Sequence, residues 1–176
     1  MSEIERFNSL HEVPSGVTMQ IVGAKELPSI RKQLTNDMLE FWQRQDQDTI
    51  RARFQVSCFN PNVVDLILNH LVYGVYLYDK NQEIIAIAEA CTDGHSPLEI
   101  GVAVEKDYRK KGLAKNSLYF LLDKCVEQGY HTFQVSTGQA NAPVKGMVRI
   151  LEAIGIPVTS RFDPIEHTYV YRWEME

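Results

Sequence analysis

The chain of 176 residues has little of what marks several specialised classes of protein. Its three cysteines, Cys58, Cys91 and Cys125, are 33 and 34 positions apart, which gives no CxxC pair and no disulfide framework. No run of about 20 apolar residues offers a membrane span, and residues 1–10 are too charged to resemble an export signal. We therefore expect three buried thiols, a cytoplasmic location, no membrane partner and no metal site.

Positive charge is also scarce. The formal net charge is −5 and the pI is near 5.6, whereas nucleic-acid-binding domains are usually strongly basic, so we expect no nucleic-acid partner. We find no internal repeat and no linker-like segment. With 44% hydrophobic residues, a chain of this length can bury a full core. The simplest organisation is a short leader over 1–16 and a single domain over 17–176.

Hydrophobic periodicity predicts alternating strands and helices. Apolar residues spaced by three and four predict a helix from Leu27 into 43–48, a second after Pro61, a third ending before Gly129 and a fourth ending before Gly155. Residues 50–59 show neither the helical spacing of three and four nor the alternation of a strand clearly. Alternation of apolar and polar residues predicts seven strands, over 17–22, 72–78, 83–91, 98–104, 130–136, 158–162 and 168–173.

The turn between the fourth strand and the third helix concentrates positive charge. From Glu105 to Lys115 there are five basic and two acidic residues, a local charge of +3, so the remainder of the chain carries −8. A helix start presents free backbone N–H groups and a positive dipole end, which suit phosphate. Gly112 lets a ligand approach the backbone closely. By itself the pattern is more often that of a solvated basic turn.

The segment Arg109-Lys110-Lys111-Gly112-Leu113-Ala114 resembles the [Q/R]xxGx[G/A] signature of the GNAT family of N-acetyltransferases. The order of elements over 17–173 resembles that family too. The resemblance implies a mixed α/β (α+β) fold, with a mostly antiparallel sheet of about seven strands, about four helices and a splayed opening between the fourth and fifth strands. It also implies acetyl-CoA as cosubstrate, and no metal.

The resemblance further implies which residues bind coenzyme A. The backbone of Lys110, Lys111, Gly112, Leu113 and Ala114 would hold the pyrophosphate, flanked by Arg109 and Lys115, and the pantetheine arm would run along Val102, Ala103 and Val104. Asn141 would touch pantetheine or cap its helix, although it lies fourteen positions before Gly155, where the family usually shows about eleven.

Direct transfer to an amine needs a base, because a lysine amine with a pKa near 10.4 costs about 4.6 kcal/mol to deprotonate at pH 7. Glu99, ten positions before Arg109, is the candidate, as several family members carry a base glutamate there. A solvent-facing carboxylate at a strand edge is the alternative. The backbone N–H of Val102 or Ala103 could stabilise charge on the acetyl oxygen. Leu151 stands where many members have a tyrosine as general acid.

The acceptor stays open among a protein lysine, a peptide amino terminus and a small amine. Residues 43–59 loosely resemble the acceptor segment of bacterial protein-lysine acetyltransferases. The negative remainder of the chain leads us to expect attraction of a cationic acceptor. Two rivals are a non-catalytic acyl-CoA-sensing module and a purely structural interaction domain. A homodimer is an open alternative for the assembly.

Overall fold

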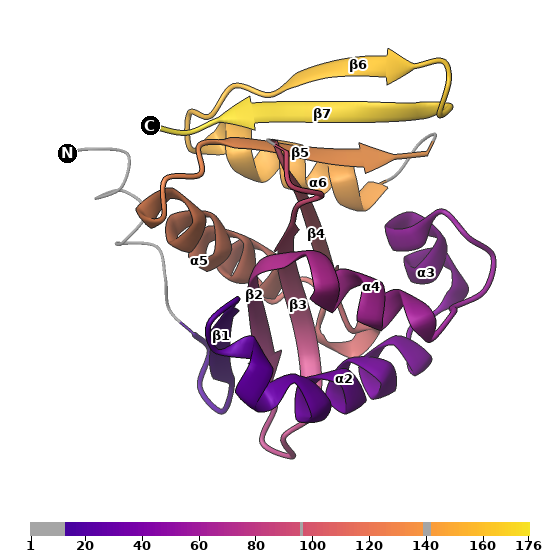
Figure 1. Ribbon diagram of the computed structural model, residues 1–176, viewed down its shortest axis with the longest axis vertical. Coiled ribbons are helices and arrows are strands. Elements are labelled where there is room, and N and C mark those ends of the chain that lie inside the picture. The colour runs from indigo at the N-terminus through magenta and orange to yellow at the C-terminus, as the bar shows by residue number, and fades with distance from the viewer. Residues whose placement is uncertain (1–12, 96, 139–141) are drawn as a thin grey trace.

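The computed structural model describes residues 13–95, 97–138 and 142–176 and shows a single seven-stranded sheet between two groups of helices (Figure 1). The elements, in chain order, are β1 (Thr18–Gly23), α2 (Leu27–Gln43), α3 (Gln47–Phe54), α4 (Asn62–His70), β2 (Leu71–Tyr78), β3 (Ile84–Cys91), β4 (Leu98–Val104), the 3-10 turn η1 (Lys106–Tyr108), α5 (Leu113–Glu127), β5 (Thr132–Thr137), α6 (Ala142–Ala153), β6 (Thr159–Asp163) and β7 (Thr168–Glu174).

The strands lie in the order β1-β2-β3-β4-β5-β7-β6, and every neighbouring pair except β4 with β5 is antiparallel. The predicted mixed, mostly antiparallel sheet of seven strands is confirmed. The parallel pair is short, because only Leu98 with Phe133 and Glu99 with Gln134 are in register. Beyond these residues the two strands separate, so the predicted splayed opening between β4 and β5 is present.

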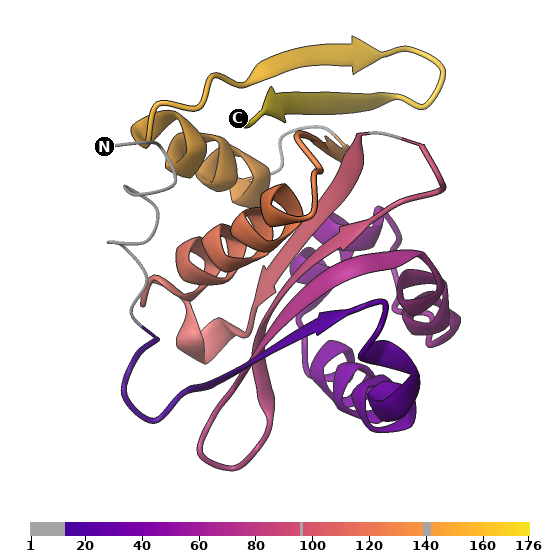
Figure 2. The same ribbon diagram turned by 60° about the vertical axis from the view of Figure 1, so that its left-hand side comes forward.

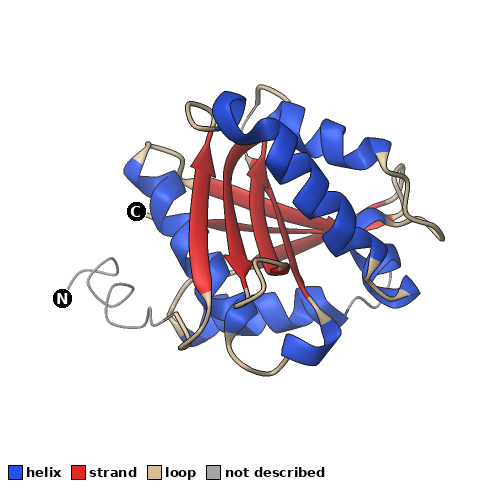
Figure 3. Cartoon of the chain, turned by 90° about the horizontal axis from the view of Figure 1, so that it is seen from below, coloured by secondary structure: helices blue, strands red, loops and turns tan. Residues whose placement is uncertain are grey.

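Helices cover both faces of the sheet (Figures 2 and 3). One face, which carries Val75, Leu98 and Phe133, packs against α5 and α6. The other face, which carries Tyr76 and Ile87, packs against Leu34 and the other apolar side chains of α2, α3 and α4. We call the first the α5 face and the second the α3 face.

One helix was not predicted. Helix α3 lies within the stretch that the sequence left loosely placed, and of its eight residues only Ile50 is buried, so it has no apolar period to recognise. Asp46 caps it by accepting a hydrogen bond of 2.7 Å from the backbone N–H of Thr49. The fold therefore has five α-helices among the described residues, where the pattern indicated about four.

Candidate active site

The opening begins at Glu99, whose carboxylate joins the two strands at the point where they separate. Its Oε1 accepts a hydrogen bond of 2.7 Å from the backbone N–H of Ser136, and its Oε2 accepts one of 2.9 Å from Gln134 Nε2. The Ser136 hydroxyl lies 3.4 Å from Oε2. A carboxylate offers about four lone-pair positions, so at least one remains for a further proton donor. The half-buried Glu99 is thus not the solvent-facing carboxylate of the alternative interpretation.

Strand register decides which β4 backbone groups face the opening. Just beyond β4, the N–H of Glu105 donates to the carbonyl of Ile85 on the β3 side, at 2.9 Å. Because antiparallel neighbours bond at alternate positions, the N–H of Ala103 also points toward β3. The N–H groups of Val102 and Val104 point the other way, where β5 no longer pairs with β4. Within the described residues no strand pairs with them there, so they could bind an extended ligand.

The basic turn lies at the far end of β4. Gly112 is the N-cap of α5 with φ +79°, and Lys110 is also left-handed with φ +62°, a conformation that costs a residue with a side chain about 1 kcal/mol. No side chain caps the helix, so the first N–H groups of α5 have no side-chain partner among the described residues. A Cβ added to Gly112 would meet no atom within 4 Å. An anion can therefore reach these N–H groups.

The side chains around this turn have different surroundings. Leu113 is buried, so only its backbone can face a ligand, whereas Lys110 and Lys111 are exposed. The Nζ of Lys111 lies 4.9 Å from the centre of the Tyr108 ring, and that of Lys115 lies 5.6 Å from the Tyr119 ring. Ala114 is half-buried at the start of α5. Several lysine ammonium groups are thus held near an uncapped helix start.

Arg109 points away from this turn and toward α3. Its Nε donates to the carbonyl of Val104 at 3.0 Å, and its Nη2 donates to Thr49 Oγ1 at 2.6 Å and to Asp46 Oδ2 at 3.3 Å. The hydrogen bonds from Thr49, and to a smaller extent the Arg109 guanidinium, lower the pKa of Asp46. Arg109 therefore ties the basic turn to α3.

Two residues on the α3 face, Glu89 and Arg53, were not predicted from the sequence as part of the site. Glu89 on β3 is fully buried and pairs with Gly101 across the strands, and its Oε2 lies 3.4 Å from Arg53 Nη2. The Tyr76 hydroxyl donates to Glu89 Oε1 at 3.3 Å. Burial raises the pKa of Glu89, and Arg53 opposes that rise. The sequence feature that could have indicated Glu89 is that it is a single charged residue inside the apolar run of β3.

Several expected residues lie elsewhere or outside the described part. Asn141 is outside the described residues. Leu151 is fully buried in the core of the α5 face and brings no hydroxyl to the opening. Thr137, at the end of β5, is buried with no hydrogen-bond partner for Oγ1 among the described residues. Cys58 is exposed and Cys91 is half-buried, so of the three thiols expected to be buried only Cys125 is fully so.

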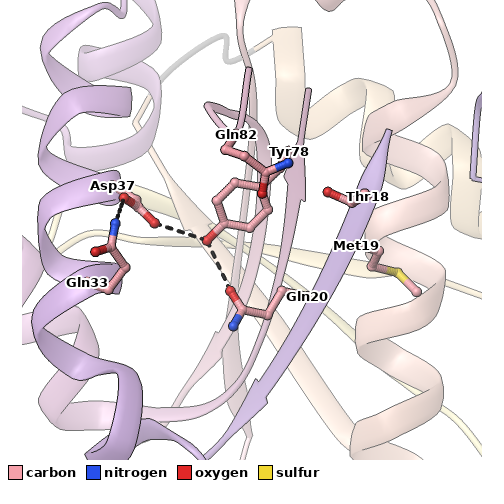
Figure 4. A pocket seen from close by; sticks show the side chains of 7 residues that line it. All are labelled: Thr18, Met19, Gln20, Gln33, Asp37, Tyr78 and Gln82. Carbon is pink, nitrogen blue, oxygen red and sulfur yellow. Dashed lines mark hydrogen bonds between the residues drawn. The ribbon is translucent and has the colours of Figure 1, made fainter. Parts of the chain in front are cut away.

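A hollow of about 400 Å³ lies apart from the opening, between β1, β2 and α2, and β2 and β3 separate it from β4. Figure 4 shows the Tyr78 hydroxyl directed at Asp37 and Gln20, at 3.4 and 3.1 Å. Burial raises the pKa of Tyr78. Because of its distance along the sheet, we assign this hollow no part in chemistry at Glu99.

Comparison with known proteins identifies this arrangement. The family model described as Acetyltransferase (GNAT) family matches residues 27–151, which is most of the chain. The chain belongs to the GNAT acetyltransferase family. Membership agrees with the splayed strands and with the uncapped helix start, and it accounts for the match of Gly112 to the family signature. The GNAT fold binds acetyl-CoA, and the residues around the opening fit such a ligand.

Solved structures share the GNAT fold at low sequence identity. The GNAT domain of PAT from S. lividans is 14% identical with a TM-score of 0.68, over 93% of this chain and all of that one. The ribosomal-protein-S18-alanine N-acetyltransferase of Escherichia coli is 15% identical with a TM-score of 0.58, over 90% of this chain and 92% of that one. The yncA protein of Salmonella typhimurium, solved with its cofactor acetyl-CoA, is 14% identical with a TM-score of 0.55, over 92% and 94%.

One curated protein also matches in sequence. The T-cell activation Rho GTPase-activating protein of Homo sapiens is 30% identical over 111 residues, 55% of this chain. The match spans only 15% of that protein's length. Among the described residues, no helix is long and apolar enough to cross a membrane, and no three potential metal ligands lie together.

Proposed function

We propose that this GNAT protein transfers an acetyl group from acetyl-CoA directly to an amine, with Glu99 as the general base. The observation that carries the proposal is the position of Glu99 at the closed end of the opening, with a lone pair still available. Acetyl-CoA supplies the activated acetyl thioester. The acceptor classes are a protein lysine, a peptide amino terminus and a small amine, and we expect the reaction to take place in the cytoplasm.

Groups of the chain bind the cosubstrate, stabilise the developing charge and accept the proton. The N–H of Val104 holds the extended arm of the cosubstrate, while the start of α5 holds its phosphates. The N–H of Val102 donates to the acetyl oxygen, where negative charge develops during attack. Glu99 takes the proton that the amine loses as the N–C bond forms.

The leaving thiolate takes its proton from water. The C–S bond breaks as the thiolate leaves. Leu151 stands where many family members have a tyrosine, but it is buried and apolar, so it cannot donate a proton to the thiolate. This feature favours the rival function of an acyl-CoA-sensing module that binds and does not transfer. The carboxylate of Glu99 at the opening favours the acetyltransferase function instead.

Glu99→Gln separates the two functions. The amide oxygen can still accept from Ser136, so acetyl-CoA binding should not change, while loss of the base should lower kcat by about 10²- to 10⁴-fold. The measurements are the thermal shift produced by acetyl-CoA, and acetyl transfer to a mixed panel of lysine peptides, amino-terminal peptides and small amines. Glu83→Gln, in the exposed turn before β3, is the matched control. Tight binding by the wild type with no transfer to any acceptor would support the sensor instead.

A further inference from the structure

The guanidinium of Arg53 lies directly on the backbone of β4 beside the candidate base. A Cβ added to Gly101 would collide with the Arg53 guanidinium carbon. Gly101 does not have a positive φ, so its backbone does not require glycine. Glycine inside a strand commonly marks a close approach by another group. The absence of a side chain at Gly101 therefore provides space for a group above β4, and Arg53 fills part of it.

Most hydrogen-bonding capacity of Arg53 is unused within the described residues. A guanidinium has five N–H donors in a planar fork, and the polar contact that Arg53 makes there is the one from Nη2 to Glu89, at 3.4 Å. The Arg53 side chain is 20% exposed, and its guanidinium carbon lies 5.4 Å from the centre of the Phe54 ring. It is a partly enclosed, oriented cation with donors to spare. A carboxylate is the group that such a fork binds in bidentate fashion.

A second arginine lies on the other side of Glu99. Arg172 on β7 donates from Nε to Gln134 Oε1 at 3.0 Å, and Gln134 donates to Glu99. Within the described residues Arg172 forms no ion pair with a carboxylate. Arg53 thus lies over β4 at Gly101, two residues from the candidate base, and Arg172 is linked to that base through Gln134, while Glu89 contacts both Arg53 and Tyr76.

The spacing suits a short acceptor that carries both charges. Glu99 and Gly101 lie on the same face of β4, two residues apart, which is about 6.6 Å along a strand. An amine donating to Glu99 and a carboxylate accepting from Arg53 can bridge that distance when only a few bonds separate them.

Resting on the proposed acetyl transfer, we propose that Arg53 selects the acceptor by binding a carboxylate that lies a few bonds from the reacting amine, as in a free amino acid. The reaction itself is unchanged, with the N–C bond formed, the C–S bond broken and the amine proton passed to Glu99. Arg53 is a specificity-determining residue that contacts the acceptor and takes no proton.

The test compares matched acceptors. A set of free amino acids is compared with the same set as carboxamides, which lack the carboxylate and have a lower amine pKa, so a preference for the acids cannot arise from easier deprotonation. Acetylated product is measured by mass spectrometry alongside release of free thiol. We expect the wild-type kcat/KM to favour the acids by about 10- to 100-fold, the scale of a charge-assisted hydrogen bond. Arg53→Gln should bring the ratio to about one by raising KM for the acids and not for the amides.

Three further variants keep the result interpretable. Arg53→Gln leaves Glu89 buried without its cation, so the double variant Arg53→Gln with Glu89→Gln repeats the measurement in a fold that holds no unpaired carboxylate. Arg53→Lys keeps the charge without the fork and should retain part of the preference. Arg51→Gln, an exposed position of the same helix that pairs with Asp48, should leave the ratio unchanged.

The outcomes separate this proposal from the proposed function. Equal use of acids and amides by the wild type, or an unchanged ratio in both the single and the double variant, would overturn the role of Arg53. Transfer to lysine peptides with none to either set would overturn it as well, while leaving the acetyltransferase function standing. No transfer to any amine, with acetyl-CoA still bound, would overturn both.

Discussion

Glu99 on β4 accepts a hydrogen bond of 2.7 Å from the backbone N–H of Ser136 on β5, two residues after Gln134, where pairing of these strands ends. A side chain thus continues the contact between strands for one more step after the backbone ladder stops. Because hydrogen bonds to Ser136 and Gln134 fix both oxygens, the orientation of the carboxylate is set before any ligand arrives. Such preorganisation is what a general base near a reacting amine requires.

Gly112→Leu should weaken binding of acetyl-CoA. A side chain at φ +79° is strained and would stand in the space in front of the first N–H groups of α5. The stabilisation of the fold by a fixed concentration of acetyl-CoA should fall, as measured by the shift in Tm. Gly129→Leu is the matched control, because Gly129 has φ +85° at the other end of α5. Equal loss of the ligand-induced shift in both variants would count against a phosphate site at Gly112.

Asp46→Ala should loosen α3 by about 1 kcal/mol, the usual value of an N-cap. It removes the acceptor for the Thr49 N–H and the partner of Arg109. The pKa of Asp46 is lowered mainly by the Thr49 N–H, so its stabilisation is present above its ordinary value of 3.8 and is lost as pH falls through the lowered pKa. Hydrogen exchange of α3 amides measures the effect. Asp48→Ala removes an almost fully exposed carboxylate whose contact with Arg51 is 3.9 Å long, so it should change exchange much less.

Gly101→Ala should destabilise the fold, although glycine to alanine in a compatible strand usually stabilises by about 0.4–1 kcal/mol. The added methyl group would displace the far end of the Arg53 side chain, so the cost comes from the contact between Arg53 and the buried Glu89 that is lost. In an Arg53→Ala background the same change should become neutral or stabilising. Urea unfolding of the four proteins of this double-mutant cycle measures the reversal. Additive free energies would mean that Arg53 does not occupy this space in solution.

Glu89→Gln should gain stability relative to the wild type as pH rises. Burial raises the pKa of Glu89 above its ordinary value of 4.5, so the folded state is favoured by this group below that value and loses the advantage as pH rises through the raised pKa. The amide has no such transition. The difference in Tm between variant and wild type, followed from acid to neutral pH, measures it, and a flat difference would contradict the raised pKa. Glu83→Gln is again the control.

The fold could be predicted where packing leaves a period in the sequence. Helices α2, α4 and α5 bury one face against the sheet, so their apolar residues recur. Strand β5 alternates for the same reason, whereas β2 and β3 are buried on both faces and show as continuous apolar runs. Helix α3 buries Ile50 alone, and its remaining signal was the cap formed by Asp46 and Thr49. A short capped helix on the surface leaves too little pattern to recognise.

One part of the candidate site could likewise be predicted from the sequence, and another part could not. The turn around Gly112 and the strand before it form one continuous stretch of sequence, so a local motif could indicate them. Arg53 and Glu89 are 36 positions apart and meet because α3 lies over β3 and β4. No spacing rule relates residues on a helix and a strand that only tertiary packing brings together. The contact of Arg53 with Glu89 and Gly101 could therefore not be predicted, although the sequence indicated residues 43–59 as a candidate acceptor segment.

The exposure of Cys58 gives direct experimental access to this side of the molecule. Burial raises the pKa of both Cys91 and Cys125 to about 12, which keeps their thiols protonated and slow to react near neutral pH. Cys58 lies in the connection between α3 and α4 and is exposed. A maleimide fluorophore should therefore label the unmodified sequence at this one position, and its emission would report when an acceptor reaches the helix that carries Arg53.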